Sequence, residues 1–205
     1  MTTPMNIAVR GLFATPVAEL EVADAETRNA ELTAIILKRR DRTPSAQASN
    51  AGGWHSDRNM MKWGGKHIGQ ILEIAKGMAS QLTTDWQSKA VRPSWRVQAW
   101  ANVNGPGDGN ICHYHPASFW SGTYYVADGG CAADPSLGGE FEMLDPRGPG
   151  PGMYAPSLRF AGQDGVSAIR PSPGLLFIFP SWLSHQVRPY RGTGLRISIA
   201  FNLSL

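Results

Sequence analysis

Residues 195–203 read LRISIAFNL, and this stretch decides the fold that we expect. Apolar residues alternate in it with polar or small ones, which is the pattern of a β-strand that buries one face in a core. The second face carries Arg196, Ser198, Ala200 and Asn202. Residues 175–179 (LLFIF) are continuously apolar, as expected for a strand that is buried on both faces. Alternation also marks residues 96–103 and 121–126, so the second half of the chain predicts several strands.

The first half of the chain has the spacing of helices. Residues 24–40 place apolar residues on one helical face, and Asp24 is the expected N-cap. Residues 66–86 show the same spacing, so we expect a second helix that packs one face on a large surface. Residues 42–64 are rich in turn formers, and residues 7–22 read as an early extended segment.

The order of these elements, helices before antiparallel strands, predicts an α+β protein with a barrel or sandwich. A chain of 205 residues suits one domain. We expect a helical N-terminal part over about 1–92 and a barrel core over about 93–205. Charged residues make up only 17% of the chain, while glycine and proline number 23 and 15, which favours turns and short strands over a helical bundle.

Composition also limits the partners that we expect. The net charge is only +3, and the one basic run, residues 38–40, ends a predicted helix where cations suit the helix dipole, so we expect no nucleic-acid binding. No stretch approaches the roughly 18 apolar residues of a membrane span, and the first residues lack the apolar core of a signal peptide. We therefore expect a cytoplasmic protein without a membrane partner, in which Cys112 and Cys131 are free thiols. The seven tryptophans leave room for a homodimer face.

Three of the five histidines occur where a metal site can form. His113 and His115 are two residues apart, so on an extended segment both side chains project to the same face. His185 follows the buried strand at 175–179 and is the natural third ligand. Neutral imidazole suits Fe(II), Zn, Cu and Ni, so the ligand type alone does not choose the metal.

Arg196 predicts an anion-binding pocket beside these histidines. If the apolar face of its strand packs on the helices, Arg196 points into the barrel, where a guanidinium is costly unless it meets an anion. Ser121, Thr123 and Tyr125 also share one strand face and all carry hydroxyl groups. The guanidinium is shaped for bidentate pairing with a carboxylate, so a small carboxylic acid fits this interior. The alternative is a salt bridge between Arg196 and a local Asp or Glu.

These motifs resemble those of the 2-oxoglutarate/Fe(II)-dependent oxygenases, and within them a family of small bacterial and phage proteins. The resemblance covers residues 96–203 and appears in five pieces in order, with a further likeness at residues 49–56. The pieces are H-x-H (113–115), SGTYYV (121–126), GGEFEMLDPR (138–147), PGLLFIFPSWLSHQVRP (173–189) and LRISIAFN (195–202). It implies a double-stranded β-helix, which is a jelly-roll or cupin-like barrel, with the N-terminal helices packed outside it.

The resemblance also assigns roles to individual residues. His113, His115 and His185 fall on the metal ligands, and Arg196 falls on the arginine that binds 2-oxoglutarate. Further contacts to this co-substrate are implied for Ser198, Tyr125, Asn102 and Asn104. The implied cofactors are Fe(II), 2-oxoglutarate and O2, and the implied activity couples oxidative decarboxylation of 2-oxoglutarate to hydroxylation of a small-molecule or peptide substrate.

His115 departs from the family pattern, which has a carboxylate at this position. Three explanations stand open. His115 ligates the metal itself, or an acid folds in from Asp108, Asp128 or Glu140, or the register shifts so that His115 and Ala117 form the motif.

Other functions also remain open at this point. The alternative to an oxygenase is a cupin-like protein that binds or senses a metal without turnover, and a metal-free structural barrel is a third interpretation. Arg196, Ser198 and Tyr125 favour the oxygenase, because a mere metal binder does not need them. Trp54 and His55 lie in a glycine-containing segment that forms either a lid over the pocket or a surface loop held by one tryptophan.

Overall fold

The structure, a computed structural model, describes residues 8, 10–148 and 165–205. Its helices are α1 (Ala25–Arg40), α2 (Met60–Trp63), α3 (Gly65–Gln81) and the short 3-10 helix η1 (Pro135–Leu137). Its strands are β1 (Ala18–Glu21), β2 (Asn50–Ala51), β3 (Trp54–His55), β4 (Arg96–Asn104), β5 (Gly109–His113), β6 (Trp120–Asp128), β7 (Phe141–Leu144), β8 (Val166–Ile169), β9 (Leu175–Pro180), β10 (His185–Val187) and β11 (Arg196–Ser204).

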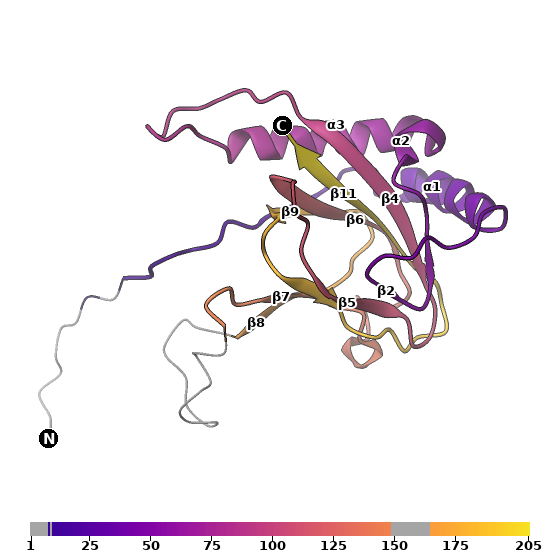
Figure 1. The fold of residues 1–205 in the computed structure, drawn as a ribbon. Helices are drawn as coiled ribbons and strands as arrows, with labels where there is room; N and C mark the ends of the chain where they lie inside the picture. The colour runs from indigo at the N-terminus through magenta and orange to yellow at the C-terminus, as the bar shows by residue number, and fades with distance from the viewer. Residues whose placement is uncertain (1–7, 9, 149–164) are drawn as a thin grey trace, which may run out of the picture.

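The strands form two antiparallel sheets. The larger sheet has the order β1-β9-β6-β11-β4-β3, and the smaller sheet has the order β2-β5-β10-β7-β8. Figure 1 shows α1, α2 and α3 on one side of the larger sheet and the smaller sheet on its other side. The protein is therefore a mixed α/β structure in three layers, which confirms the expected combination of helices and antiparallel strands.

The first core lies between the helices and the larger sheet. The apolar face of β11 enters it through Ile197, Ile199, Phe201 and Leu203, all at most 1% exposed. The helices supply Leu32, Ile36, Ile68, Ile71, Leu72 and Ala75. This confirms the predicted orientation of β11, and it leaves the opposite face of the strand to point toward the smaller sheet.

The second core lies between the two sheets and is rich in aromatic rings. Tyr125 and Phe177 come from the larger sheet, and Phe141 comes from the smaller sheet. The ring centroids of Phe141 and Phe177 lie 4.9 Å apart in an edge-on arrangement. This cluster fixes the spacing of the sheets on one side of the interior, and the polar side chains of β4, β5, β10 and β11 share the remainder.

Several predicted element ends differ from the observed ones. Asp24 is the N-cap residue of α1, as predicted, but its φ of 54° is left-handed and its side chain makes no capping hydrogen bond. The helix expected over 66–86 ends at Gln81. The Asp85 carboxylate accepts hydrogen bonds from the backbone N–H groups of Gln87 and Lys89, and this local turn replaces a further helical turn.

The sequence did not predict two short strands in the stretch 42–64. Each of them extends a sheet: β2 pairs with β5, and β3 pairs with β4. Trp54 and His55 are both buried in β3, at 8% and 3% exposure, so this segment is neither a lid nor a surface loop.

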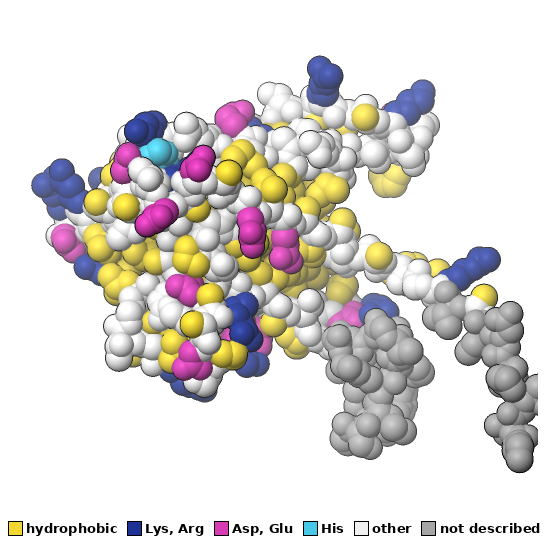
Figure 2. Space-filling view, turned by 180° about the vertical axis from the view of Figure 1, so that it is seen from behind, with side chains coloured by type: hydrophobic (Ala, Val, Ile, Leu, Met, Phe, Trp, Pro, Cys, Tyr) yellow, Lys and Arg dark blue, Asp and Glu magenta, His cyan; other side chains and the backbone are white. Residues whose placement is uncertain are grey.

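The surface seen in Figure 2 shows Lys and Arg side chains dispersed, with Asp and Glu between them, rather than gathered into one patch. Among the helices that the structure describes, none has the length and apolar character needed to cross a membrane.

Candidate metal centre and its pocket

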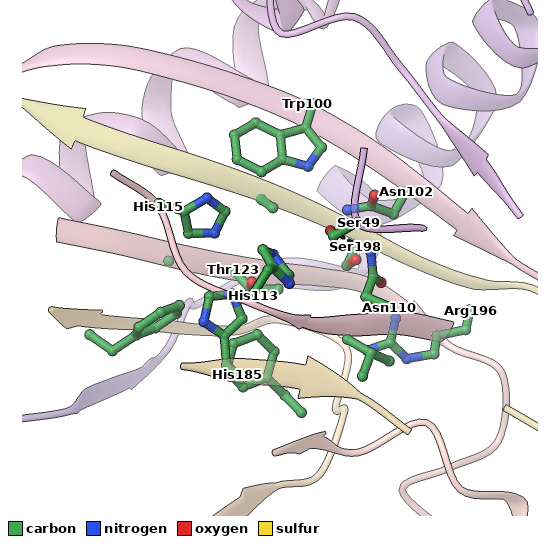
Figure 3. A pocket seen from close by; sticks show the side chains of 15 residues that line it. Ser49, Trp100, Asn102, Asn110, His113, His115, Thr123, His185, Arg196 and Ser198 are labelled. Carbon is green, nitrogen blue, oxygen red and sulfur yellow. Dashed lines mark hydrogen bonds between the residues drawn. The ribbon is translucent and has the colours of Figure 1, made fainter. Parts of the chain in front are cut away.

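The three predicted metal ligands converge in the space between the sheets. His113 ends β5 and His185 begins β10, and the two are paired across these antiparallel strands. His115 follows two residues after His113, and its backbone N–H donates to the Ser181 carbonyl at 2.9 Å. One ligand nitrogen from each ring can be chosen so that all lie within 4.8 Å of one another. Figure 3 shows the three rings turned toward a common point.

Backbone carbonyls orient two of these rings. The Nδ1 atoms of His113 and His185 lie 2.8 Å from the carbonyl oxygens of Ile111 and Leu183. In these contacts Nδ1–H is the donor, which leaves the Nε2 lone pair free to bind a metal. Phe141 stacks on the His185 ring with centroids 4.9 Å apart and so restricts its rotation.

Burial keeps the imidazoles neutral. Loss of hydration, assisted by the neighbouring histidines, lowers the pKa of His185 to about 3 and that of His115 to about 4. Burial also lowers the pKa of His113. The neutral imidazole is the form that binds a metal, so near neutral pH the cluster is in the protonation state that ligation requires.

Arg196 lies deeper in the same pocket, with 1% of its surface exposed. Its Nε donates to the Gly139 carbonyl at 3.0 Å, and its two terminal nitrogens donate to Asn104 Oδ1 and the Tyr125 hydroxyl, both at 3.2 Å. Within residues 10–148 and 165–205, no Asp or Glu forms a salt bridge with it. The alternative of a local salt bridge is therefore not found in the described structure, and the guanidinium is held by neutral groups alone.

The pairing of β4 with β11 arranges the inward side chains in levels. Arg196 is paired with Asn104, Ser198 with Asn102, and Ala200 with Trp100. In Figure 3, Arg196 and the histidines lie at different places along the pocket, with Trp100 and His115 toward the end away from Arg196.

Asn102 has a buried amide that is incompletely paired. The side chain is 8% exposed, and its Oδ1 lacks a hydrogen-bond partner among the described residues. Leaving such an atom unpaired is costly, so the pocket favours a ligand or a water molecule that can satisfy it.

All eight residues predicted for the site are brought together, but they occupy different positions. His113, His115, His185, Arg196, Ser198 and Asn102 line the pocket. Asn104 and Tyr125 stand next to Arg196 and hold its guanidinium. Burial raises the pKa of the Tyr125 hydroxyl, which accepts from Arg196 and keeps its own proton available for donation.

None of Asp108, Asp128 and Glu140, the acids considered as substitutes for His115, belongs to the histidine cluster. Asp108 accepts a hydrogen bond from the Gly105 backbone N–H, and Asp128 accepts bonds from Gly130 and Ala132. The cluster of ligand-type side chains at this place contains the three histidines and no carboxylate of the described chain. Ala117, which the shifted register would use, lies in a turn with a φ of 63°.

The lining residues that sequence reasoning missed include the polar or aromatic side chains of Ser49, Trp100 and Asn110. Trp100 shares the alternating face of β4 with Asn102 and Asn104, so the period of two could have identified it. Ser49 precedes the unpredicted strand β2, and its hydroxyl accepts from the Asn110 amide at 3.2 Å. The likeness at residues 49–56 pointed to this segment, but no residue pattern identified Ser49 as a lining residue.

A family model described as "Putative 2OG-Fe(II) oxygenase" matches residues 98–202, about half of the chain. Similar solved structures include a prolyl-4-hydroxylase from Pseudomonas putida, with a TM-score of 0.65, 16% identity, and coverage of 93% of this chain and 92% of that one. A prolyl hydroxylase from Trichoplax adhaerens, in complex with a hypoxia inducible factor peptide, has a TM-score of 0.65, 14% identity, and coverage of 92% and 83%.

HygX from Streptomyces hygroscopicus, with nickel and 2-oxoglutarate bound, has a TM-score of 0.55, 10% identity, and coverage of 93% and 83%. At these identities the likeness concerns the fold. No curated protein matches the sequence.

Proposed function

Because the chain belongs to the family of 2OG-Fe(II) oxygenases and is thus a hydroxylating dioxygenase, we propose that His113, His115 and His185 bind its Fe(II). We further propose that Arg196 binds 2-oxoglutarate beside the metal. The observation that carries this assignment is that one pocket holds three neutral imidazoles together with a buried guanidinium, which has no acidic partner among the residues that the structure describes.

The donor set fits a divalent first-row metal. Three imidazole nitrogens from one side leave other coordination positions open, as an oxygenase requires. When bound, Fe(II) supplies the oxidative chemistry that couples decarboxylation of 2-oxoglutarate by O2 to hydroxylation of the substrate. The residues of the chain bind and orient the reactants and exclude water from the pocket.

The surroundings of Arg196 fit a carboxylate. A guanidinium has five N–H donors, and the protein uses one on each nitrogen of Arg196, so one remains free on each terminal nitrogen. These two donors can bind one carboxylate in a bidentate manner. The Tyr125 hydroxyl can donate to the same carboxylate, and Ser198 and Asn102 form the next inward-facing pair along β11 and β4.

We also propose that the two sheets form a double-stranded β-helix. The two facing antiparallel sheets, with helices on the outside of the larger one, are suited to a double-stranded β-helix. Three N-terminal strands extend the sheets, because β1 pairs with β9, β2 with β5 and β3 with β4. These pairings support a single domain over 1–205 in which the N-terminal part helps to build the sheets.

The experiment that tests this function separates metal binding from co-substrate binding. Arg196→Ala should retain bound metal, measured by elemental analysis, and should lose 2-oxoglutarate binding, measured by titration calorimetry of the Ni(II)-loaded protein without turnover. Arg191→Ala is the matched control, because Arg191 is exposed and precedes the same strand. Equal 2-oxoglutarate affinity in wild type and Arg196→Ala would place the anchor elsewhere, and absence of binding to wild type would overturn the proposed function.

A further inference from the structure

The metal cluster divides the pocket into a co-substrate end and a second end around Trp100. Arg196 and Ala200 are four residues apart on β11, which corresponds to roughly 13 Å along a strand. Trp100 is paired with Ala200, and its ring centroid lies 5.8 Å from that of His115. Trp100 therefore lies beside the metal ligands, in the lining pair that is farthest from Arg196 along β4 and β11. 2-Oxoglutarate bound at Arg196 leaves this end of the pocket free for the primary substrate.

Arg58 adds a cation at this second end. Its guanidinium carbon lies 5.6 Å from the centroid of a Trp100 ring, within the range of a cation–π contact. The side chain is exposed, and within the described residues it forms neither a salt bridge nor a side-chain hydrogen bond. A guanidinium held over an aromatic ring keeps its edge donors free for a planar anion.

The backbone around Arg58 is held firmly to β4. The Ala99 N–H donates to the Arg58 carbonyl at 3.3 Å, and the Ser56 N–H donates to the Ala101 carbonyl at 2.9 Å. Met60, two residues further on, is fully buried in the first core. Arg58 is therefore placed by fixed structure on both sides, which lowers the entropic cost of binding a ligand.

The charges of the pocket favour a negatively charged substrate. Among the described residues that line it there is no Asp or Glu, and three imidazole ligands add no negative charge. Fe(II) brings two positive charges and Arg196 a third, while the two carboxylates of 2-oxoglutarate neutralise two of these. Among these groups one positive charge remains in a poorly hydrated interior, and Arg58 adds another beside Trp100, so an anionic substrate is attracted and a cationic one is repelled.

We propose that Arg58 and Trp100 form the subsite for the primary substrate, and that this substrate carries a carboxylate that pairs with Arg58. The proposal rests on the function proposed above, because it assumes that 2-oxoglutarate occupies the Arg196 end. Arg58 acts as a specificity-determining residue. His55 stacks on the Trp100 ring with centroids 5.7 Å apart, so only the part of Trp100 that lines the pocket contacts the apolar part of the substrate.

The test uses matched pairs of small probes that differ only in charge. Each pair consists of a carboxylate and its primary amide, for example hippurate and hippuramide. The set of pairs includes aliphatic compounds, aromatic compounds and derivatives of acidic amino acids. Binding to Zn(II)-loaded protein saturated with 2-oxoglutarate is measured by saturation-transfer NMR and by Trp fluorescence. Wild type should bind the carboxylate of at least one pair about tenfold more tightly than its amide.

Arg58→Gln should lose this preference, and Arg58→Lys should keep part of it because the charge remains without the planar fork. Arg42→Gln is the control, because it removes one exposed positive charge away from the lining residues and should retain the full preference. Failure of every carboxylate to bind at millimolar concentration, or a preference that persists in Arg58→Gln, would overturn the proposal.

Binding of 2-oxoglutarate distinguishes failure of the proposed function from failure of the substrate assignment. Arg58→Gln should bind 2-oxoglutarate with the affinity of wild type. If wild type does not bind 2-oxoglutarate, the proposed function fails. If it does bind but Arg58 has no effect on the probes, only the substrate assignment fails.

Discussion

His113 and His185 are direct partners across the antiparallel pair β5–β10, and their ring centroids lie 4.3 Å apart. Backbone pairing thus brings together two residues that are distant in the sequence and whose imidazole rings can bind one metal ion. The pairing register shifts between His185 and Val187, immediately after this first pair of the ladder. Strand irregularities of this kind are common next to active sites, where they direct a side chain.

The role of His115 can be tested by comparing two substitutions. His115→Ala removes a ligand and should weaken Fe(II) or Zn(II) binding by at least about tenfold, whereas His115→Asp keeps a ligand and should retain tight binding. Affinity is measured by competition with a chromophoric chelator. His67→Ala is the control, because His67 lies on α3 and contacts Glu31. Unchanged affinity in His115→Ala would show that this residue is not a ligand.

Tyr125 and its neighbour Tyr124 provide a matched pair. Tyr125→Phe should weaken 2-oxoglutarate binding by about tenfold, because a hydrogen bond to a charged group is worth roughly 1.5 kcal/mol. Tyr124 points to the other face of β6 and donates to Asn29 Oδ1 at 2.7 Å, so Tyr124→Phe should leave the affinity unchanged. Titration calorimetry measures both, and equal effects of the two substitutions would contradict the assigned position of the co-substrate.

The metal-free protein should lose stability as the pH falls from 7 to 5. The pKa of His185 is about 3 in the folded protein, below its unfolded value of about 6.5. Between these values the unfolded chain binds a proton that the folded chain excludes, so the free energy of unfolding decreases as the pH falls. The expected loss from His185 is about 1–2 kcal/mol at pH 5.

Urea unfolding at several pH values measures this dependence. In His185→Gln the slope of stability against pH should be smaller, because the unfolded chain no longer binds a proton at residue 185. An identical slope in wild type and His185→Gln would show that His185 is not buried in its neutral form.

Gly122 is required by packing in the larger sheet. A Cβ atom at this position would lie 2.5 Å from the Phe177 carbonyl oxygen and would also collide with the Phe201 ring. Gly122→Ala should therefore lower the free energy of unfolding by about 1–3 kcal/mol. Gly69→Ala is a control of opposite sign, because a Cβ there meets no atom within 4 Å and alanine favours the helix. Denaturant unfolding of both variants measures the difference, and a neutral Gly122→Ala would contradict the packing.

Sequence patterns were most informative where burial imposes a strict period. The alternation in residues 195–203 placed Ile197 and Ile199 in the core and Arg196 in the interior, and the structure confirms both. The spacing of His113 and His115 placed both rings on the same side, where His185 joins them. These predictions succeeded because a strand has only two faces, and a shift by one residue would bury the polar side chains in place of the apolar ones.

Other features depend on long-range contacts that local patterns do not contain. The strands β2 and β3 have two residues each, and their pairing partners lie about fifty to sixty residues away in the sequence. Arg58 lies over Trp100, which lines the pocket, only because this segment is held to β4. The stretch 42–64 was predicted to be irregular because it is rich in turn formers, but it contains β2, β3 and α2. Turn chemistry does not specify which sheet edge a two-residue strand will join.

The central claim is that one pocket binds Fe(II) through the histidine cluster and 2-oxoglutarate through Arg196. An anaerobic titration of the Fe(II)-loaded protein with 2-oxoglutarate, followed by visible absorbance, tests it most directly. Wild type should develop a charge-transfer band that saturates at one equivalent, because the co-substrate binds the metal. His185→Ala should show no band for lack of metal, and Arg196→Ala should show none at the same 2-oxoglutarate concentration while it retains the metal. A wild-type protein that binds Fe(II) but develops no band, or a band that Arg196→Ala leaves unchanged, would contradict the claim.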